Sequence, residues 1–85
     1  MSEFDDLKQK ISKFVDDRDW DQYHTPKNLC MALIAECGEL VEHFQWLSEE
    51  QSAELSSEKL EEVSHEIADV FVYLLRLSDK LGIDL

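Results

Sequence analysis

The chain has 85 residues, and its 20 acidic residues outnumber its 8 basic residues so strongly that the formal net charge is −12. A surface this acidic repels polyanions, so we expect neither nucleic acid nor an anionic membrane surface as a partner. The chain also lacks the roughly 20 consecutive apolar residues of a membrane span and the N-terminal pattern of a secretory signal, which predicts a cytoplasmic protein. Its length corresponds to a single domain, residues 1–85, yet 44% of the residues are hydrophobic. Because an isolated chain of this size buries too little surface to cover them, we expect a homo-oligomer.

Apolar residues recur at helical spacing along most of the chain, which contains only two glycines and one proline. This pattern predicts helices over residues 3–17, 26–46 and 56–81, joined by a loop and by a polar linker that holds at most one loose turn. Thr25 is the expected N-cap of the second helix, with Pro26 at its first position, and Gly82 is the expected stop after the third helix. The predicted fold is therefore all-α, an antiparallel bundle of three main helices completed by oligomerisation.

The third helix is expected to be capped by Ser56 or Ser57. Cys30 and Cys37 both fall on the second helix, roughly 10 Å apart along its axis, which is too far for a disulfide bond. We expect them to be reduced thiols in the core of a cytoplasmic protein.

Two pairs of carboxylates stand out, Glu36-x-x-Glu39 and Glu66-x-x-Asp69. Spacing of three residues places both members of a pair on one face of a helix. Glu36 also lies in line with four leucines of the second helix, which are Leu29, Leu33, Leu40 and Leu47. An ionised carboxylate at such a core position is unfavourable unless a cation meets it. Brought face to face, the two pairs would offer the oxygen ligands that Mg²⁺ prefers, so all four are candidate metal ligands and catalytic residues.

The evidence for the second pair is weaker. Glu66 and Asp69 lie opposite the main apolar stripe of the third helix, and taken alone they describe a solvated face. That stripe, the expected core side, consists of Leu60, Val63, Ile67, Val70, Leu74, Leu77 and Leu81. Other apolar residues flank the acids on both sides, however, and such a narrow polar strip favours an internal site between helices or between subunits.

Three other interpretations of the acidic residues are weaker. His65-Glu66-x-x-Asp69 resembles the helical zinc-protease motif but has an aspartate in place of the second histidine. Glu62-x-x-His65 supplies only one of the two elements that a di-iron carboxylate site needs. The alternative from a different functional class is a non-catalytic acidic helical interaction module.

The two carboxylate pairs match, in composition and order, the ExxE and ExxD signature of the MazG-type nucleotide pyrophosphohydrolases. The match becomes more specific when three further segments are included, which are residues 18–29 (RDWDQYHTPKNL), 38–40 (GEL) and 44–46 (FQW). With them the chain closely resembles the small dCTP pyrophosphatase branch of that family over nearly its whole length. Relatives generally continue into a further C-terminal segment with basic and amide residues near the phosphates, whereas this chain ends at Asp84-Leu85.

The resemblance implies an enzyme, a nucleoside triphosphate pyrophosphatase that assembles as a homotetramer built from dimers, or as a dimer. It implies Mg²⁺-dependent hydrolysis of dCTP or other deoxynucleoside triphosphates, modified bases included, to the monophosphate and pyrophosphate by attack of water at the α-phosphate. Such an activity serves housecleaning of the nucleotide pool. The residues expected to contact the substrate are Trp20 and Trp46 at the base, His24 and Asn28 at the base or sugar, Lys27 at the phosphates and Tyr73 at the deoxyribose.

Overall fold

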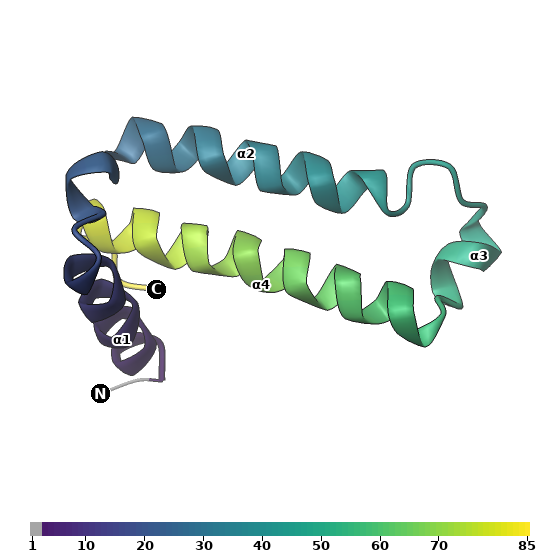
Figure 1. Cartoon of the computed structure of the whole chain (residues 1–85), viewed down its shortest axis with the longest axis horizontal. Helices are drawn as coiled ribbons and strands as arrows, with labels where there is room; N and C mark the ends of the chain where they lie inside the picture. Colours follow the sequence, from purple (N-terminus) through teal and green to yellow (C-terminus); the bar gives the residue numbers. More distant parts are fainter. Residues whose placement is uncertain (1–2) are drawn as a thin grey trace.

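The computed structural model describes residues 3–85, which form a long helical hairpin with a further helix packed across one end (Figure 1). In chain order the elements are α1 (Glu3–Asp17), the 3₁₀ turn η1 (Asp21–Tyr23), α2 (Pro26–Glu42), α3 (Glu49–Ala53) and α4 (Ser57–Lys80). No strand is present among these residues, so the predicted all-α class is confirmed. No helix in the described part of the chain is long and apolar enough to cross a membrane.

The helix ends follow the predicted capping chemistry. Thr25 accepts a hydrogen bond from the backbone N–H of Asn28, and Pro26 occupies the first turn of α2. The side chain of Ser56 accepts from the backbone N–H of Lys59, which makes it the N-cap of α4. Gly82 follows α4 with a φ of 68°, a conformation that a residue without Cβ adopts easily.

α2 is shorter than the predicted helix, because it ends at Glu42 rather than near residue 46. The backbone N–H groups of His43 and Phe44 bond to the carbonyls of Leu40 and Val41, three residues back. The last turn therefore tightens from α to 3₁₀ geometry, a change that apolar periodicity does not reveal. The linker that follows contains α3, whose first turn is closed by reciprocal hydrogen bonds between Ser48 and Gln51.

α1 ends in a turn that the sequence analysis did not anticipate. Asp19 has a φ of 61°, although it is not a glycine. The N–H groups of Asp19 and Trp20 bond back to the carbonyls of Asp16 and Val15. This is the same terminal motif that Gly82 forms after α4, and it redirects the chain from α1 into η1.

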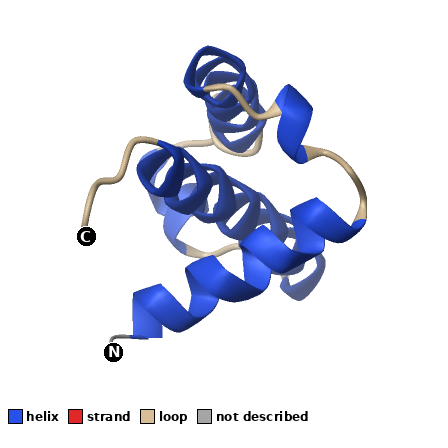
Figure 2. Cartoon of the chain, turned by 90° about the vertical axis from the view of Figure 1, so that its left-hand side faces the viewer, coloured by secondary structure: helices blue, strands red, loops and turns tan. Residues whose placement is uncertain are grey.

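α2 and α4 lie side by side and antiparallel, with α3 at the far end of the hairpin and both chain ends near α1 (Figure 1). α1 packs across the C-terminal half of α4, as the end-on view shows (Figure 2). The apolar core of the described residues is small and consists of Val15, Leu29, Val63 and Leu75. Leu29 is only 1% exposed, so the predicted leucine face of α2 does turn inward.

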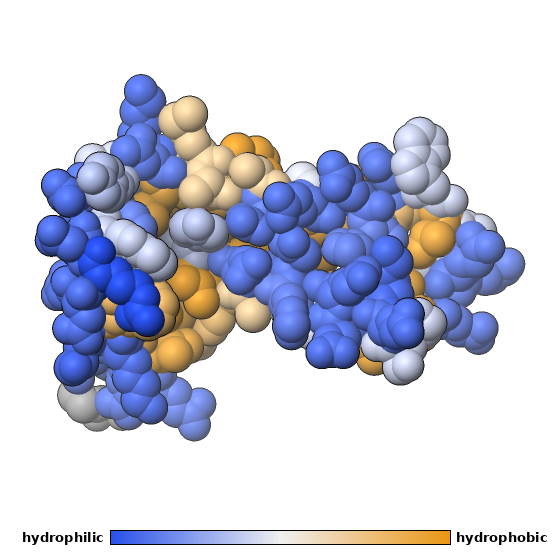
Figure 3. Space-filling model, in the orientation of Figure 1, coloured by the Kyte–Doolittle hydropathy of each residue, from blue (hydrophilic) through white to orange (hydrophobic). Residues whose placement is uncertain are grey.

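The predicted core stripe of the third helix is wrong in part for the single chain. Leu60, Ile67 and Leu74 are all exposed, whereas Val63 of the same stripe is buried and Glu66, from the opposite face, is half-buried against α2. Sequence periodicity finds the most apolar face of a helix, but it does not tell whether that face meets the same chain or another one. On α2, Cys30 is likewise exposed rather than in the core. Apolar side chains are visible chiefly toward the α1 end of the face in Figure 3, whereas hydrophilic ones dominate toward α3.

Candidate functional site

The antiparallel pairing of α2 and α4 brings three of the four predicted carboxylates together. Glu36, Glu39 and Glu66 each offer an oxygen atom, and these three atoms lie within 4.8 Å of one another. Glu36 and Glu66 are half-buried between the helices, whereas Glu39 is exposed. The arrangement follows from the leucine face of α2, which turns Glu36 toward α4 along with its apolar neighbours.

Two carboxylate oxygens of this group lack a hydrogen-bond partner among the described residues. Oε2 of Glu36 and Oε2 of Glu66 are both buried, and neither has a hydrogen-bond partner among residues 3–85. Burial first, and then the neighbouring Glu36 and Glu39, which accept a shared proton and repel a second charge, together raise the pKa of Glu66 to about 7. The group therefore needs a proton or a cation to balance its charge.

Asp69 lies outside the group of three but on the same side of α4. Burial raises the pKa of Tyr73, and the negative charges of Glu36 and Asp69 raise it further. Tyr73 is half-buried and stands one helical turn beyond Asp69 on α4.

The donor set of this site is made of carboxylate oxygens alone. Oxygen-only sites suit small hard cations such as Mg²⁺ or Ca²⁺ better than Zn²⁺, which favours nitrogen and sulfur ligands. The two unpartnered buried oxygens are the atoms that such a cation would satisfy. The residues present therefore fit a divalent hard cation.

The two tryptophans predicted at the base do not meet within one chain. Trp20 precedes α2, where its ring packs edge-on against Phe14 with 5.7 Å between centroids. Trp46 follows α2 at its other end and is 86% exposed. The 17 residues of α2 separate them, which corresponds to ~25 Å of helix. One chain cannot place both rings on the same base.

The remaining predicted substrate residues gather at the N-terminal end of α2. Lys27 is exposed there. Asn28 is exposed as well, and its side-chain amide donates to the carbonyl of Tyr23 at 3.1 Å, which ties η1 to α2. His24 is half-buried, and its Nδ1 accepts a hydrogen bond from Nε of Arg76 at 3.3 Å.

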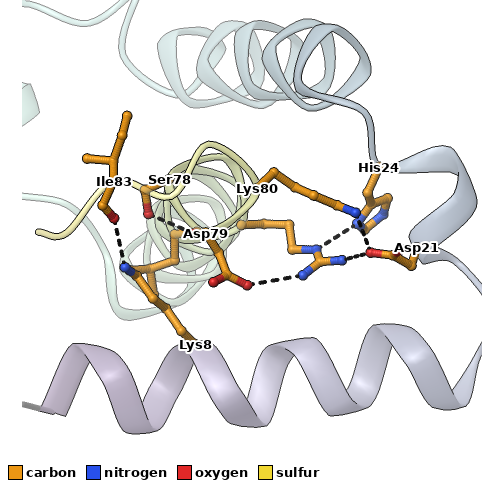
Figure 4. A network of polar contacts seen from close by, with 9 residues as sticks. Lys8, Asp21, His24, Ser78, Asp79, Lys80 and Ile83 are labelled. Carbon is orange, nitrogen blue, oxygen red and sulfur yellow. Dashed lines mark hydrogen bonds and ion pairs between the residues drawn. The ribbon is translucent and has the colours of Figure 1, made fainter. Parts of the chain in front are cut away.

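Arg76 is the residue of this region that the sequence analysis missed. It is 4% exposed and pairs with Asp21 of η1 and with Asp79 of α4. Lys80 also binds Asp21, with 2.6 Å between Nζ and Oδ1, so this lysine is engaged inside the chain (Figure 4). Lys80, and then Arg76, lower the pKa of Asp21. A signal was present in the sequence, because Arg76 interrupts an apolar run and shares a helical face with Asp69 and Tyr73.

Known proteins resemble this chain in sequence and in structure. The MazG-like family model matches residues 32–85. The dCTP pyrophosphatase 1 proteins of Rattus norvegicus and Homo sapiens are 36% and 35% identical to the chain over 83 residues. Each of these alignments covers 95% of this chain and 49% of the relative, so the chain spans about half the length of the curated relatives it matches.

A solved relative extends the match to the fold. The crystal structure of a pyrophosphatase from Archaeoglobus fulgidus has 40% sequence identity and a TM-score of 0.91, over 99% of this chain and 79% of that one. The resemblance inferred from the carboxylate pairs and their flanking segments is thereby confirmed. The chain belongs to the MazG-like family.

Proposed function

We propose that this chain is a Mg²⁺-dependent pyrophosphatase that converts a deoxynucleoside triphosphate into the monophosphate and pyrophosphate. The observation that carries the proposal is the carboxylate group between α2 and α4, in which two buried oxygens have no hydrogen-bond partner within the described part of the chain. The relatives support it by name, since two are dCTP pyrophosphatases and one is a pyrophosphatase. An acidic surface feature without a ligand would not hold two carboxylates half-buried and unpaired.

Glu36, Glu39 and Glu66 would hold Mg²⁺ through their carboxylate oxygens. When bound, the ion supplies positive charge beside the phosphates and makes water a stronger acid. That charge matters because a protein with a net charge of −12 repels a triphosphate. Because its pKa is raised to about 7, Glu66 keeps a proton in part of the molecules near neutral pH. It would release that proton when the ion binds, and all three carboxylates would then carry charge.

In the proposed reaction, water adds to the α-phosphorus and the bond from that phosphorus to the bridging oxygen breaks. Pyrophosphate leaves, and the proton of the attacking water passes to a carboxylate oxygen. Asp69, the fourth of the predicted carboxylates, follows Glu66 on the same side of α4 and is available as a further oxygen ligand or as the proton acceptor. Tyr73 borders the group at a position suited to packing against the deoxyribose.

Two observations support an assembly of at least two chains. The described residues expose an apolar stripe on α4 that includes Leu60, Ile67 and Leu74, while Ile34 and Val41 are exposed on α2. Exposed apolar surface of this kind marks an interaction site. The distance between Trp20 and Trp46 adds a functional reason, because a base stacked between tryptophans would need one from each of two chains.

The simplest test of the proposal is to identify the reaction products. The purified chain is incubated with a panel of normal and base-modified deoxynucleoside triphosphates and Mg²⁺, and the products are separated by anion exchange. We expect monophosphate and pyrophosphate in equal amounts, dCTP among the substrates, and no turnover in EDTA. Glu66→Gln should lose activity at least ~100-fold, whereas Glu61→Gln, which removes the same charge from an exposed site on the same helix, should not.

Two results would contradict this function. Release of single phosphate with formation of a diphosphate would place the attack at the wrong phosphorus. No turnover of any nucleotide would favour the non-catalytic interaction module.

A further inference from the structure

Arg76 is a charged side chain whose orientation is fixed from three directions. Nη1 donates to Asp79 at 3.4 Å, Nη2 donates to Asp21, and Nε donates to Nδ1 of His24 at 3.3 Å. Asp21 is held a second time by Lys80, as Figure 4 shows. Because the guanidinium cannot rotate without losing its two ion pairs, the direction of its Nε–H is set by the fold.

That geometry determines where the imidazole proton lies. Arginine stays protonated in proteins and has no acceptor atom, so the nitrogen facing it must be the acceptor. Nδ1 of His24 therefore carries no proton, and in the neutral ring the proton sits on Nε2. Among residues 3–85, Nε2 itself has no hydrogen-bond partner.

We propose that Arg76 is a positioning residue that fixes His24 as the neutral Nε2–H tautomer, a permanent hydrogen-bond donor at the N-terminal end of α2. Protonation of Nδ1 would place a second donor against the guanidinium and break the hydrogen bond. Three charged groups face the ring, Asp21 on η1 and Arg76 and Lys80 on α4. Burial first, and then the charges of Arg76 and Lys80, lower the pKa of His24, while Asp21 opposes them.

The use of this donor rests on the proposed function. Glu36 lies ten residues beyond Pro26, the first residue of α2, which corresponds to ~15 Å along the helix. A single phosphate group cannot span that distance. If a nucleotide held by its phosphates at the carboxylates extends toward the N-terminal end of α2, it meets His24 through its nucleoside, at a carbonyl oxygen, a ring nitrogen or a sugar hydroxyl.

The tautomer can be read directly by two-bond ¹H–¹⁵N correlation on the ¹⁵N-labelled protein. His24→Gln identifies the signals of His24 among the three histidines of the chain. At slightly alkaline pH the wild-type protein should show one protonated nitrogen, Nε2, and one unprotonated nitrogen, Nδ1. An Nδ1–H tautomer, or a rapidly averaged mixture, would overturn the proposal without any variant of Arg76 being needed.

Two variants distinguish the effect of the hydrogen bond from Arg76 to His24 from the effect of positive charge near the imidazole ring. Arg76→Lys keeps the positive charge but loses the Nε–H, and it should give averaged imidazole shifts. Lys80→Met removes a positive charge from the same cluster and leaves the Arg76 hydrogen bond, so the tautomer should stay fixed while the pKa of His24 rises. A fixed Nε2–H tautomer in folded Arg76→Lys would overturn the role of Arg76.

Steady-state kinetics tests whether the orientation of His24 by Arg76 affects substrate binding. In steady-state kinetics, Arg76→Lys should raise KM for the deoxynucleoside triphosphate about tenfold and leave kcat nearly unchanged, the pattern of a lost contact to a non-reacting part of the substrate. An unchanged KM would show that His24 does not contact the nucleoside. If no nucleotide is turned over, the proposed function fails, and the tautomer measurement still decides the role of Arg76.

Discussion

Oε2 of Glu36 on α2 and Oε2 of Glu66 on α4 belong to one group of carboxylates, are both buried, and have no hydrogen-bond partner among residues 3–85. Neither ionised carboxylate can donate a hydrogen bond to the other. The pair is therefore satisfied only by a proton or by a cation. Much of the chemistry expected of the chain follows from the competition between these two.

Binding of a divalent cation should displace protons from the group. Because the pKa of Glu66 is about 7, close to half of the molecules carry its proton at that pH. Titration calorimetry with Mg²⁺ in buffers of different ionisation enthalpy should show release of about half a proton near pH 7 and almost none near pH 9. Glu66→Gln should abolish the release. Binding without proton release near neutral pH would contradict the raised pKa.

The stability of the metal-free chain should fall as the pH rises through the same range. Glu66 has a pKa of about 7 in the folded state against an ordinary value of 4.5. The folded state therefore binds more protons, and the stability that Glu66 contributes is complete below pH 4.5 and lost as the pH passes 7. His24, with its lowered pKa, acts in the opposite direction, so only a comparison with a variant isolates Glu66.

Glu66→Gln supplies that comparison, because its neutral amide resembles the protonated carboxyl. In urea denaturation with EDTA, the gain in stability of Glu66→Gln over wild type should grow between about pH 5 and about pH 8. Glu61→Gln, at an exposed site of the same helix, is the control for the loss of one carboxylate. If the stability difference between Glu66→Gln and wild type does not change with pH, the raised pKa of Glu66 does not contribute to folding stability.

The two glycines should respond oppositely to the same substitution. A Cβ added at Gly38 or Gly82 meets no atom within 4 Å, so steric contact does not distinguish them. Gly38 lies within α2, where alanine is the better helix former by ~1 kcal/mol. Gly82 has a φ of 68°, which costs an alanine ~1–2 kcal/mol. Urea denaturation should show Gly38→Ala more stable and Gly82→Ala less stable than wild type, and a shift of both in one direction would refute the assignment.

The exposed stripe of α4 should be an interface between chains. Ile67 is 53% exposed, at the centre of the stripe. Light scattering should give the wild-type protein the mass of at least two chains, and Ile67→Glu should shift it to a single chain, because a buried unpaired carboxylate opposes association. His65→Glu adds a charge at an exposed polar position of the same helix and should leave the mass unchanged. A wild-type monomer would exclude the shared site.

The sequence predicted the elements that depend on local chemistry. Thr25, Ser56 and Gly82 mark helix ends because capping uses neighbouring residues only, and the inward position of Glu36 follows from its leucine neighbours. The orientation of α4 could not be predicted in this way, since much of its most apolar face, including Leu60, Ile67 and Leu74, is exposed in the single chain. The ties of Arg76 to Asp21 and His24 join residues more than 50 positions apart, and no local pattern encodes them.

The most direct test of the carboxylate site is the rate of pyrophosphate release by Glu36→Gln at saturating Mg²⁺ and dCTP. Glu42→Gln, an exposed acid on the same helix, is its matched control. Removal of one oxygen ligand from the group should lower kcat at least ~100-fold, with the helical content unchanged and Glu42→Gln at the wild-type rate. A Glu36→Gln protein that releases pyrophosphate as fast as wild type would contradict the account.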